Sequence, residues 1–261
     1  MRIDLNADVG EGMPDEELLP FVTSVNVACG FHAGDPTTMD ATVAVALARG
    51  VRVGAHPGYA DREHFGRVAV DMPAEAIENL VLYQVAALEG FVRSRGGRLS
   101  HVKPHGALYH RGGEVPDVAR AIAEAVRRFD PDLILVGAVG SLLLEAGREA
   151  GLPVAAEAFA DRRYRPDGSL APRSGPDALL TDPDAAAAQA ASLARDGFAI
   201  ASDGSRLALH PDSICLHGDT PGAPAIARRV CDRLRREGIE IRPLEPQAGA
   251  SRRGASALRA T

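Results

Sequence analysis

Short apolar runs alternate with helical patterns along almost the whole chain of 261 residues. Seven of these runs predict β-strands, at 2–7, 24–28, 51–55, 99–103, 133–137, 154–158 and 213–217. Most of the helical stretches begin at a proline, which loses no hydrogen bond at the first helical position, and end before a glycine, which accepts a left-handed conformation. Helices are therefore predicted at 36–49, 73–95, 116–129, 141–150, 183–196 and about 226–237. This alternation predicts parallel strands joined by right-handed crossovers.

Two architectures fit the alternation: an open doubly wound sheet and a closed (β/α) barrel. An open sheet that binds nucleotides needs a glycine-rich turn after its first strand. Asp8 and Glu11 stand at that point, where they would repel an anionic pyrophosphate. We therefore predict a barrel-like α/β fold of about seven parallel strands, which forms a single domain at 1–244. Two segments lack the pattern: a polar loop or lid at 162–177 and a disordered tail at 245–261.

The charged residues and cysteines exclude several classes of protein. The chain has 29 lysines and arginines, but Lys103 is its only lysine and is followed by proline, so a Walker A phosphate loop is excluded. A formal net charge of −6 argues against a nucleic-acid partner. No apolar run approaches the ~20 residues that span a membrane. Three cysteines far apart in the sequence predict a reducing compartment, so we expect a cytoplasmic protein.

Polar residues collect at the carboxyl ends of the predicted strands, where parallel α/β folds hold their functional groups. Four of the eight histidines follow four separate strands: His32, His56, His105 and His217. A single histidine in such a place is usually structural, but four from separate strands are difficult to explain that way. Asp35 also has a structural interpretation, as the N-cap of the helix that begins at Pro36.

Two chemistries are compatible with this group of residues. Carboxylates and imidazoles bind divalent metals that activate water, although the sequence lacks the compact His-Glu-x-x-His ligand pair. Alternatively, an aspartate or glutamate acts as general base, with Lys103 or a histidine as electrophile or acid. Lys103 is also the one candidate for a Schiff base, but the surrounding acids favour charge pairing over a free amine. The residues alone leave both chemistries open.

The strand-end segments together resemble the LamB/YcsF, or lactam-utilisation, family. The resemblance covers about 2–241 and rests on several long motifs in the right order, which makes it far more specific than any short pattern. The matching segments are IDLNADVGE at 3–11, SVNVACGFHAGDP at 24–36, GAHPGY at 54–59, FGR at 65–67, HVKPHGALY at 101–109, FADR at 159–162 with Tyr164, and HGD at 217–219. The chain departs from the family in a shorter loop after Glu11 and in Val68, which stands where a second arginine is common.

The resemblance implies a barrel-like fold related to polysaccharide deacetylases and some glycoside hydrolases. It also implies that the chain is the A subunit of an ATP-dependent 5-oxoprolinase, a hydrolase that cleaves the cyclic amide 5-oxo-L-proline to L-glutamate. Two partner subunits, B and C, are implied as well. ATP would be a co-substrate of the complex, because opening an unstrained γ-lactam is uphill. Partners would contribute to ATP use, since the sequence has no recognisable nucleotide loop.

In such an enzyme the strand-end residues have expected roles. The expected catalytic residues, which would orient or activate water or stabilise negative charge, are Asp8, Glu11, His32, His56, Lys103 and His105. The expected substrate-binding residues are Asn6, Asn26, Arg67, Tyr109, Asp161, Arg162 and His217. Lys103 would stabilise charge on the lactam oxygen or on a phosphorylated intermediate. Arg67 or Arg162 would hold the substrate carboxylate through a bidentate contact. A divalent metal, if bound, is expected on Asp8, His32 and His56.

Two other functions remain open from the sequence. A metal-dependent deacetylase would share the fold and the supply of aspartates and histidines, and metal analysis would identify it. A non-catalytic subunit would bind 5-oxoproline and deliver it to an ATP-using partner. Assays of the chain alone and with its partners would separate that role from catalysis.

Overall fold

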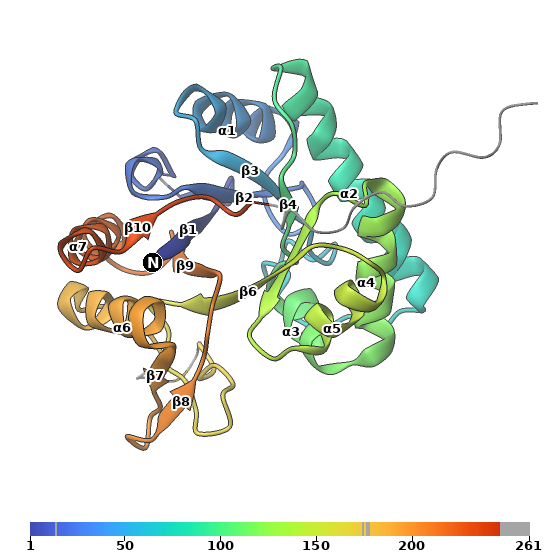
Figure 1. The fold of residues 1–261 in the computed structure, drawn as a ribbon. Helices are drawn as coiled ribbons and strands as arrows, with labels where there is room; N and C mark the ends of the chain where they lie inside the picture. The colour runs from blue at the N-terminus through green and yellow to red at the C-terminus, as the bar shows by residue number, and fades with distance from the viewer. Residues whose placement is uncertain (14, 174, 176–177, 246–261) are drawn as a thin grey trace, which may run out of the picture.

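The computed structural model of the chain describes residues 1–13, 15–173, 175 and 178–245. Its core is a closed barrel of parallel strands, in which the last barrel strand pairs with the first (Figure 1). The barrel strands are, in order, β1 (Arg2–Val9), β2 (Ser24–Ala28), β3 (Arg52–His56), β4 (His101–Val102), β5 (Ile134–Ala138), β6 (Val154–Phe159) and β9 (Ser213–His217). The predicted barrel of about seven parallel strands is confirmed, and the strand boundaries differ from the predicted ones by at most two residues.

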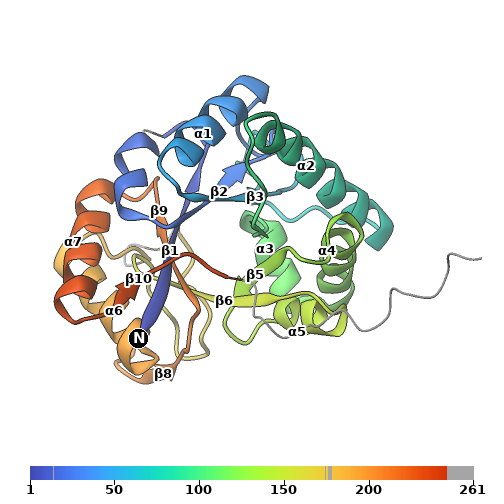
Figure 2. The ribbon, with the colours of Figure 1, turned by 45° about the horizontal axis from the view of Figure 1, so that its top comes forward.

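Helices surround the barrel on its outside (Figure 2). The predicted helices are present as α1 (Pro36–Ala48), α2 (Ala74–Ser94), α4 (Pro116–Phe129), α5 (Leu142–Glu149), α6 (Pro183–Asp196) and α7 (Ala223–Arg236). Asp35 caps α1, because its side chain accepts a hydrogen bond from the backbone of Thr38. One further helix, α3 (Gly106–Glu114), was not predicted from the sequence, and it contains the pair Gly112 and Gly113. Glycine is a poor helix former, so the helical pattern is weak there.

Several short elements were also missed, because two or three residues are too few to show a period. The strands β7 (Phe198–Ile200) and β8 (Arg206–Ala208) form an antiparallel hairpin outside the barrel. The strand β10 (Glu240–Ile241) pairs with the first residues of β1. The connection between β1 and β2 contains two 3₁₀ turns, η1 (Asp15–Glu17) and η2 (Leu19–Phe21), in the place where an α-helix follows the other barrel strands.

The predicted lid and tail lie only partly within the described residues. Single strand-type bridges tie the lid to neighbouring segments, from Arg162 to Leu179 and from Tyr164 to Ala201, and a third bridge, from Tyr164 to Leu170, lies within the lid. Nearly all of the predicted tail, at 246–261, falls outside the described residues. None of the helices in the described part of the chain is long and apolar enough to cross a membrane.

The inside of the barrel is lined by polar side chains. Successive residues of a strand point to opposite sides, so Asp4, Asn6 and Asp8 of β1 point inward while Ile3 and Leu5 join the hydrophobic core outside the barrel. All three inward residues are at most 9% exposed. The barrel therefore positions a column of buried polar groups below the carboxyl ends of its strands.

Asp4 lies at the lower end of this column. Its carboxylate accepts hydrogen bonds from the hydroxyls of Thr23, Ser24 and Ser213. Burial raises the pKa of Asp4 to about 6, although the three hydroxyls act in the opposite direction. Charged Asp4 is thus a destabilising element within the barrel.

Replacing this carboxylate should change how stability depends on pH. An acid whose pKa is raised by folding contributes stability below its unfolded pKa of about 4, and that contribution is lost as pH rises through its folded pKa. Relative to Asp4→Asn, the wild type should lose about 2 kcal/mol of unfolding free energy between pH 4 and pH 7. Urea denaturation of both proteins across this range checks the prediction, and parallel curves would contradict it.

Candidate functional site

A buried lysine lies at the top of the polar column. Lys103 directly follows β4, and its Nζ lies 2.9 Å from Asp8 Oδ1 and 2.9 Å from Glu157 Oε1. The lysine side chain is only 3% exposed. Burial alone would lower the pKa of Lys103, but the two carboxylates more than reverse this and hold it well above its usual range. Lys103 is therefore a fixed ammonium group in a site shielded from water.

Two amides below Lys103 orient its carboxylate partners. Asn6 donates to Glu157 Oε1 at 2.9 Å, and Asn26 donates to Asp8 Oδ1 at 2.8 Å. His101 Nε2 lies 2.8 Å from Asn26 Oδ1, and burial lowers the pKa of His101 to about 3. The neutral His101 ring therefore serves as a hydrogen-bond donor that fixes the Asn26 amide.

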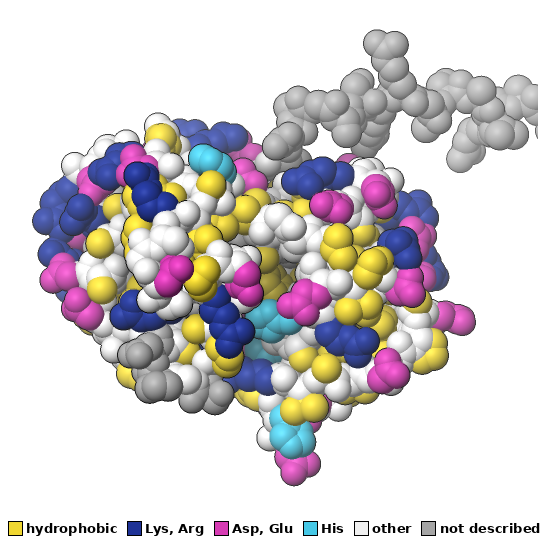
Figure 3. Space-filling view, turned by 90° about the horizontal axis from the view of Figure 1, so that it is seen from below, with side chains coloured by type: hydrophobic (Ala, Val, Ile, Leu, Met, Phe, Trp, Pro, Cys, Tyr) yellow, Lys and Arg dark blue, Asp and Glu magenta, His cyan; other side chains and the backbone are white. Residues whose placement is uncertain are grey.

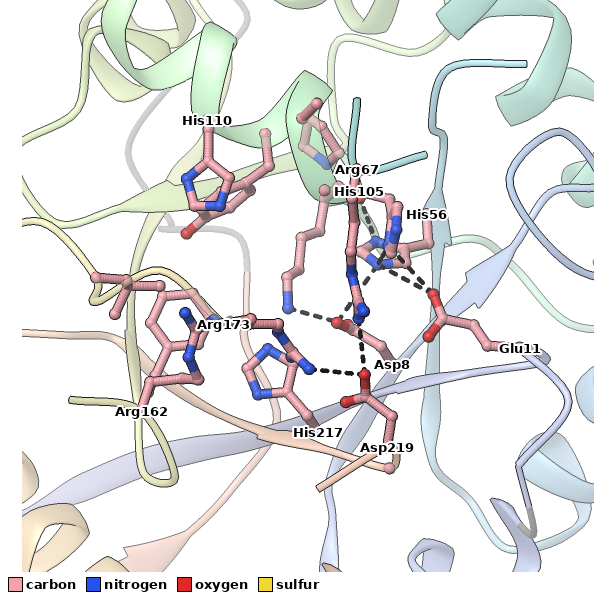
Figure 4. A pocket seen from close by; sticks show the side chains of 18 of the residues that line it. Asp8, Glu11, His56, Arg67, His105, His110, Arg162, Arg173, His217 and Asp219 are labelled. Carbon is pink, nitrogen blue, oxygen red and sulfur yellow. Dashed lines mark hydrogen bonds and ion pairs between the residues drawn. The ribbon is translucent and has the colours of Figure 1, made fainter. Parts of the chain in front are cut away.

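Three histidines surround the carboxylate of Glu11, and two of them, His56 and His105, are drawn in Figure 4. Glu11 Oε1 lies 3.0 Å from His32 Nε2, 3.2 Å from His105 Nδ1 and 3.8 Å from His56 Nε2. Burial alone would raise the pKa of Glu11, but the hydrogen bonds with His105 and His32 hold it well below its usual range. Burial lowers the pKa of His32 to about 4, whereas Asp8 raises the pKa of His56 against the effect of burial. The cluster thus combines a permanent carboxylate with a basic imidazole.

His217 belongs to a separate pair on the opposite side of Asp8. Its Nδ1 lies 2.9 Å from Asp161 Oδ1, and the other oxygen of Asp161 accepts from the Thr220 hydroxyl at 2.6 Å. Burial alone would raise the pKa of Asp161, but His217 and Thr220 lower it, so Asp161 is a charged partner. Since Nδ1 is engaged with Asp161, Nε2 of His217 is the nitrogen available for proton transfer.

A cavity of about 230 Å³ opens above these groups, at the carboxyl ends of the strands. Figure 3 shows it as a hollow with histidine at its floor and charged side chains around it. At the rim, Arg67 and Arg173 bind the same oxygen of Asp219, at 2.7 and 2.6 Å. Arg162 also lines the cavity, and burial beside Arg173 lowers its pKa to about 10. The rim thus has three guanidinium groups and one carboxylate, that of Asp219. The excess of positive charge is suited to bind an anion.

The structure brings most of the predicted site residues to this one cavity. Its lining includes Asp8, Glu11, His56, Arg67, Lys103, His105, Tyr109, Arg162 and His217. Among the described residues, Asn6, Asn26, His32 and Asp161 lie behind this lining and are almost fully buried. Direct substrate contact was expected for Asn6, Asn26 and Asp161, but Asn6 is hydrogen-bonded to Glu157, and Asn26 and Asp161 are hydrogen-bonded to Asp8 and His217 of the cavity lining.

Two residues of the site were given no role from the sequence. Glu157 binds Lys103 and also accepts a hydrogen bond from the Tyr109 hydroxyl at 2.9 Å. Its signal was a single acid within the apolar run of β6, which is unusual in a buried strand. Arg173 lies in the loop after β6, and nothing in the sequence separates it from the other arginines of that loop.

Comparisons with known proteins agree with the resemblance found in the sequence. A model of the LamB/YcsF family matches residues 3–249. The A subunit of 5-oxoprolinase from Methylococcus capsulatus is 52% identical over 248 residues, which cover 93% of this chain and 95% of that protein. The crystal structure of a lactam utilization protein from Thermus thermophilus has a TM-score of 0.87 and 45% identity, over 93% of this chain and 99% of that chain. Both relatives therefore match this chain over nearly their whole length.

The backbone of β3 at Gly54 passes close to the ring of His101, and this contact provides a test of the packing below the site. A Cβ added at Gly54 of β3 would lie 2.1 Å from His101 Nε2, so Gly54→Ala should displace the ring that holds Asn26. We expect a loss of about 2 kcal/mol of unfolding free energy, the usual cost of overpacking. Gly90→Ala in α2 is the matched control, because its added Cβ meets nothing within 4 Å. Chemical denaturation compares the two, and equal stability would contradict the prediction.

Proposed function

The chain belongs to the LamB/YcsF family, and we propose that it is the A subunit of an ATP-dependent 5-oxoprolinase, which hydrolyses 5-oxo-L-proline to L-glutamate with two partner subunits, B and C. One observation carries the proposal: a buried ammonium, Lys103, faces the same small cavity as Arg67, Arg162 and Arg173. 5-Oxoproline has an amide carbonyl on one side of its ring and a carboxylate on the other. The cavity offers positive charge for both groups.

Lys103 is suited to stabilise the charge that develops on the lactam oxygen. Attack of water on the amide carbon turns the carbonyl oxygen into an oxyanion, and a preorganised cation lowers the energy of that state. Lys103 is held by Asp8 and Glu157 at 2.9 Å each, so it needs little rearrangement as the charge forms. In a site excluded from water this interaction is stronger than at the surface.

The acids and imidazoles beside Lys103 are suited to activate the water. The pKa values of Asp8 and Glu11 are held well below their usual range, so these carboxylates are better at orienting water than at removing its proton. His56, whose Nε2 lies 3.4 Å from Asp8 Oδ2, has a raised pKa and is the stronger base. His217, on the other side of Asp8, would protonate the leaving ring nitrogen.

The arginines at the rim are suited to hold the carboxylate of the substrate. Arg67 and Arg173 share one carboxylate oxygen of Asp219, so each keeps further N–H donors for a ligand. Arg162 is 5% exposed, and its Nε has no hydrogen-bond partner among the described residues. A ligand carboxylate would satisfy this buried donor.

We place ATP binding with the partner subunits. Lys103, the only lysine of the chain, is committed to two carboxylates and lies outside any Walker A motif. Coupling to ATP therefore needs residues that partners supply, and Lys103 and the arginines would equally hold a phosphorylated intermediate passed to this cavity.

Turnover by the complete complex tests this function. ATP-dependent formation of glutamate from 5-oxoproline should require this chain, and Lys103→Met should reduce it about 100-fold to 1,000-fold, the usual cost of losing one group that stabilises an oxyanion. Near-normal glutamate formation without the chain would contradict the proposed function. Near-normal formation with Lys103→Met would contradict the role of the lysine.

A second variant separates chemistry from folding. Lys103→Met alone leaves two buried carboxylates without a counter-ion, which is destabilising. The double variant Lys103→Met with Glu157→Gln removes one of these charges and should regain stability without regaining activity. Arg93→Met, which removes an exposed cation on α2, is the control and should behave as the wild type.

Removal of the rim arginines should weaken substrate binding. A hydrogen bond between charged groups contributes about 1.5–3 kcal/mol, so Arg67→Ala and Arg173→Ala should each raise KM for 5-oxoproline about 10-fold to 100-fold, with a smaller change in kcat. Arg163→Ala is the control in the same loop, because Arg163 is exposed. Steady-state kinetics of the complex measure the effect, and an unchanged KM in both variants would show that the carboxylate binds elsewhere.

A further inference from the structure

We propose that Glu11, His56 and His105 form a binding site for one divalent transition-metal ion in the floor of the cavity. Three donor atoms from the carboxyl ends of three strands converge there: Glu11 Oε1 after β1, His56 Nε2 at the end of β3 and His105 Nδ1 after β4. Such a site is a property of the chain itself and would exist whatever reaction the cavity performs.

Both histidines are held so that one ring nitrogen faces Glu11, and this nitrogen gives up its proton when a metal ion binds. His56 Nδ1 donates to the backbone carbonyl of Lys103 at 2.7 Å, and His105 Nε2 donates to the carbonyl of Phe65 at 2.8 Å. A carbonyl on the second nitrogen is the usual outer partner of a metal-binding histidine, because it fixes the tautomer and the orientation of the ring. Phe65 has a left-handed backbone with φ of 56°, a conformation that non-glycine residues rarely adopt.

The three facing atoms have the spacing of ligands around one ion (Figure 4). Glu11 Oε1 lies 3.2 Å from His105 Nδ1 and 3.8 Å from His56 Nε2, and the two nitrogens are 3.0 Å apart. The centre of a triangle with these sides is about 2 Å from each corner, which matches zinc–nitrogen and zinc–oxygen bond lengths. Three acceptor atoms this close repel one another unless a metal ion or a shared proton lies between them.

His32 belongs to the cluster but not to the ligand set. Its ring stacks on that of His105, with centroids 3.8 Å apart and 4° between the planes. An imidazole binds a metal in the plane of its ring, so one ion cannot lie in both of these parallel planes. His32 Nε2 instead donates to Glu11 Oε1 at 3.0 Å and orients the carboxylate.

Asp8 is also better placed beside the ion than on it. Its Oδ1 accepts hydrogen bonds from Lys103 at 2.9 Å and from Asn26 at 2.8 Å, so its charge is already balanced by the ammonium. Its Oδ2 lies 3.4 Å from His56 Nε2. The ligand set proposed from the structure therefore differs from the one expected from the sequence, which was Asp8, His32 and His56.

The donor set and its surroundings indicate the class of metal site. Glu11, His56 and His105 line the cavity, whereas His32 lies behind that lining in the described part of the chain. Two imidazoles and one carboxylate, with a further position open to a cavity, are typical of catalytic rather than structural zinc sites. The same donors also bind Mn²⁺, Fe²⁺ and Co²⁺. When bound, such an ion supplies a Lewis acid or a water of lowered pKa, and it would take over the activation of water from His56, whose Nε2 it occupies.

Direct measurement of metal binding tests this site without any activity assay. The full chain is stripped with a chelator, dialysed against micromolar Zn²⁺ and examined by elemental analysis, and Co²⁺ serves as the spectroscopic probe. We expect about one equivalent of Zn²⁺ per chain, a Co²⁺ ligand-field spectrum of low coordination number, and a melting temperature that rises with Zn²⁺. Failure of the proposed function would change none of these readouts.

Variants separate ligands from outer partners. Glu11→Gln, His56→Ala and His105→Ala should each weaken Zn²⁺ binding by more than about 100-fold, because each removes a ligand. His32→Ala should weaken it by only about 10-fold to 100-fold, as expected for an outer partner. His64→Ala is the control, because His64 is exposed and lies outside the cluster. Circular dichroism of the metal-free variants separates a lost ligand from a lost fold.

Two outcomes would overturn the site. The first is a wild-type chain that takes up less than about one tenth of an equivalent of Zn²⁺ under these conditions. The second is normal binding by Glu11→Gln together with loss of binding by His217→Ala. That result would assign the ion to Asp8, Cys215 and His217, the other group of converging donors among the described residues.

Discussion

The ion pairs of Lys103 with Asp8 and Glu157 are the interaction on which the rest of the site depends. A charge removed from water is unfavourable unless it is paired and hydrogen-bonded, and here one ammonium compensates two carboxylates. Asp8 comes from β1 and Glu157 from β6, the two neighbours of β9, and Lys103 follows β4, so the lysine links its own side of the barrel wall to the far side. The amides, His56 and the tyrosine hydroxyl then satisfy the remaining carboxylate oxygens.

The residues that stabilise the barrel and the residues of the site lie in different layers of the molecule. In many (β/α) barrels the interior is filled with branched apolar side chains. Here Asp4, Asn6 and Asp8 occupy inward positions, and the hydrophobic core lies between the strands and the surrounding helices. Apolar burial outside the barrel provides most of the stability, and the interior can hold groups that are unfavourable for folding but suited to chemistry.

The sequence predicted the barrel because long helical patterns, marked by proline and glycine, separate its strands. It also predicted that the polar strand-end residues lie together, because parallel topology brings the strand ends to one edge wherever they lie in the chain. How far each inward side chain lies below the cavity could not be predicted. Asn6 and Asp8 are on the same face of β1, but of the two only Asp8 lines the cavity. Nor were the stacking of His32 on His105 or the position of Arg173, which depend on side-chain rotamers and on the path of a loop.

Closure of the barrel by β1 and β9 also affects how the chain folds while it is being synthesised. Asp8 and His217 are register partners in this closure, so His217 and Asp219 join the rest of the site only after nearly the whole chain has been synthesised. Until then β1 has one unpaired edge, a hazard for aggregation. Its alternating Asp4, Asn6 and Asp8 interrupt what would otherwise be a continuous apolar strand. Polar residues at alternate positions of an unpaired strand counter its aggregation, so Asn6 and Asp8 serve the folding of β1 as well as the site.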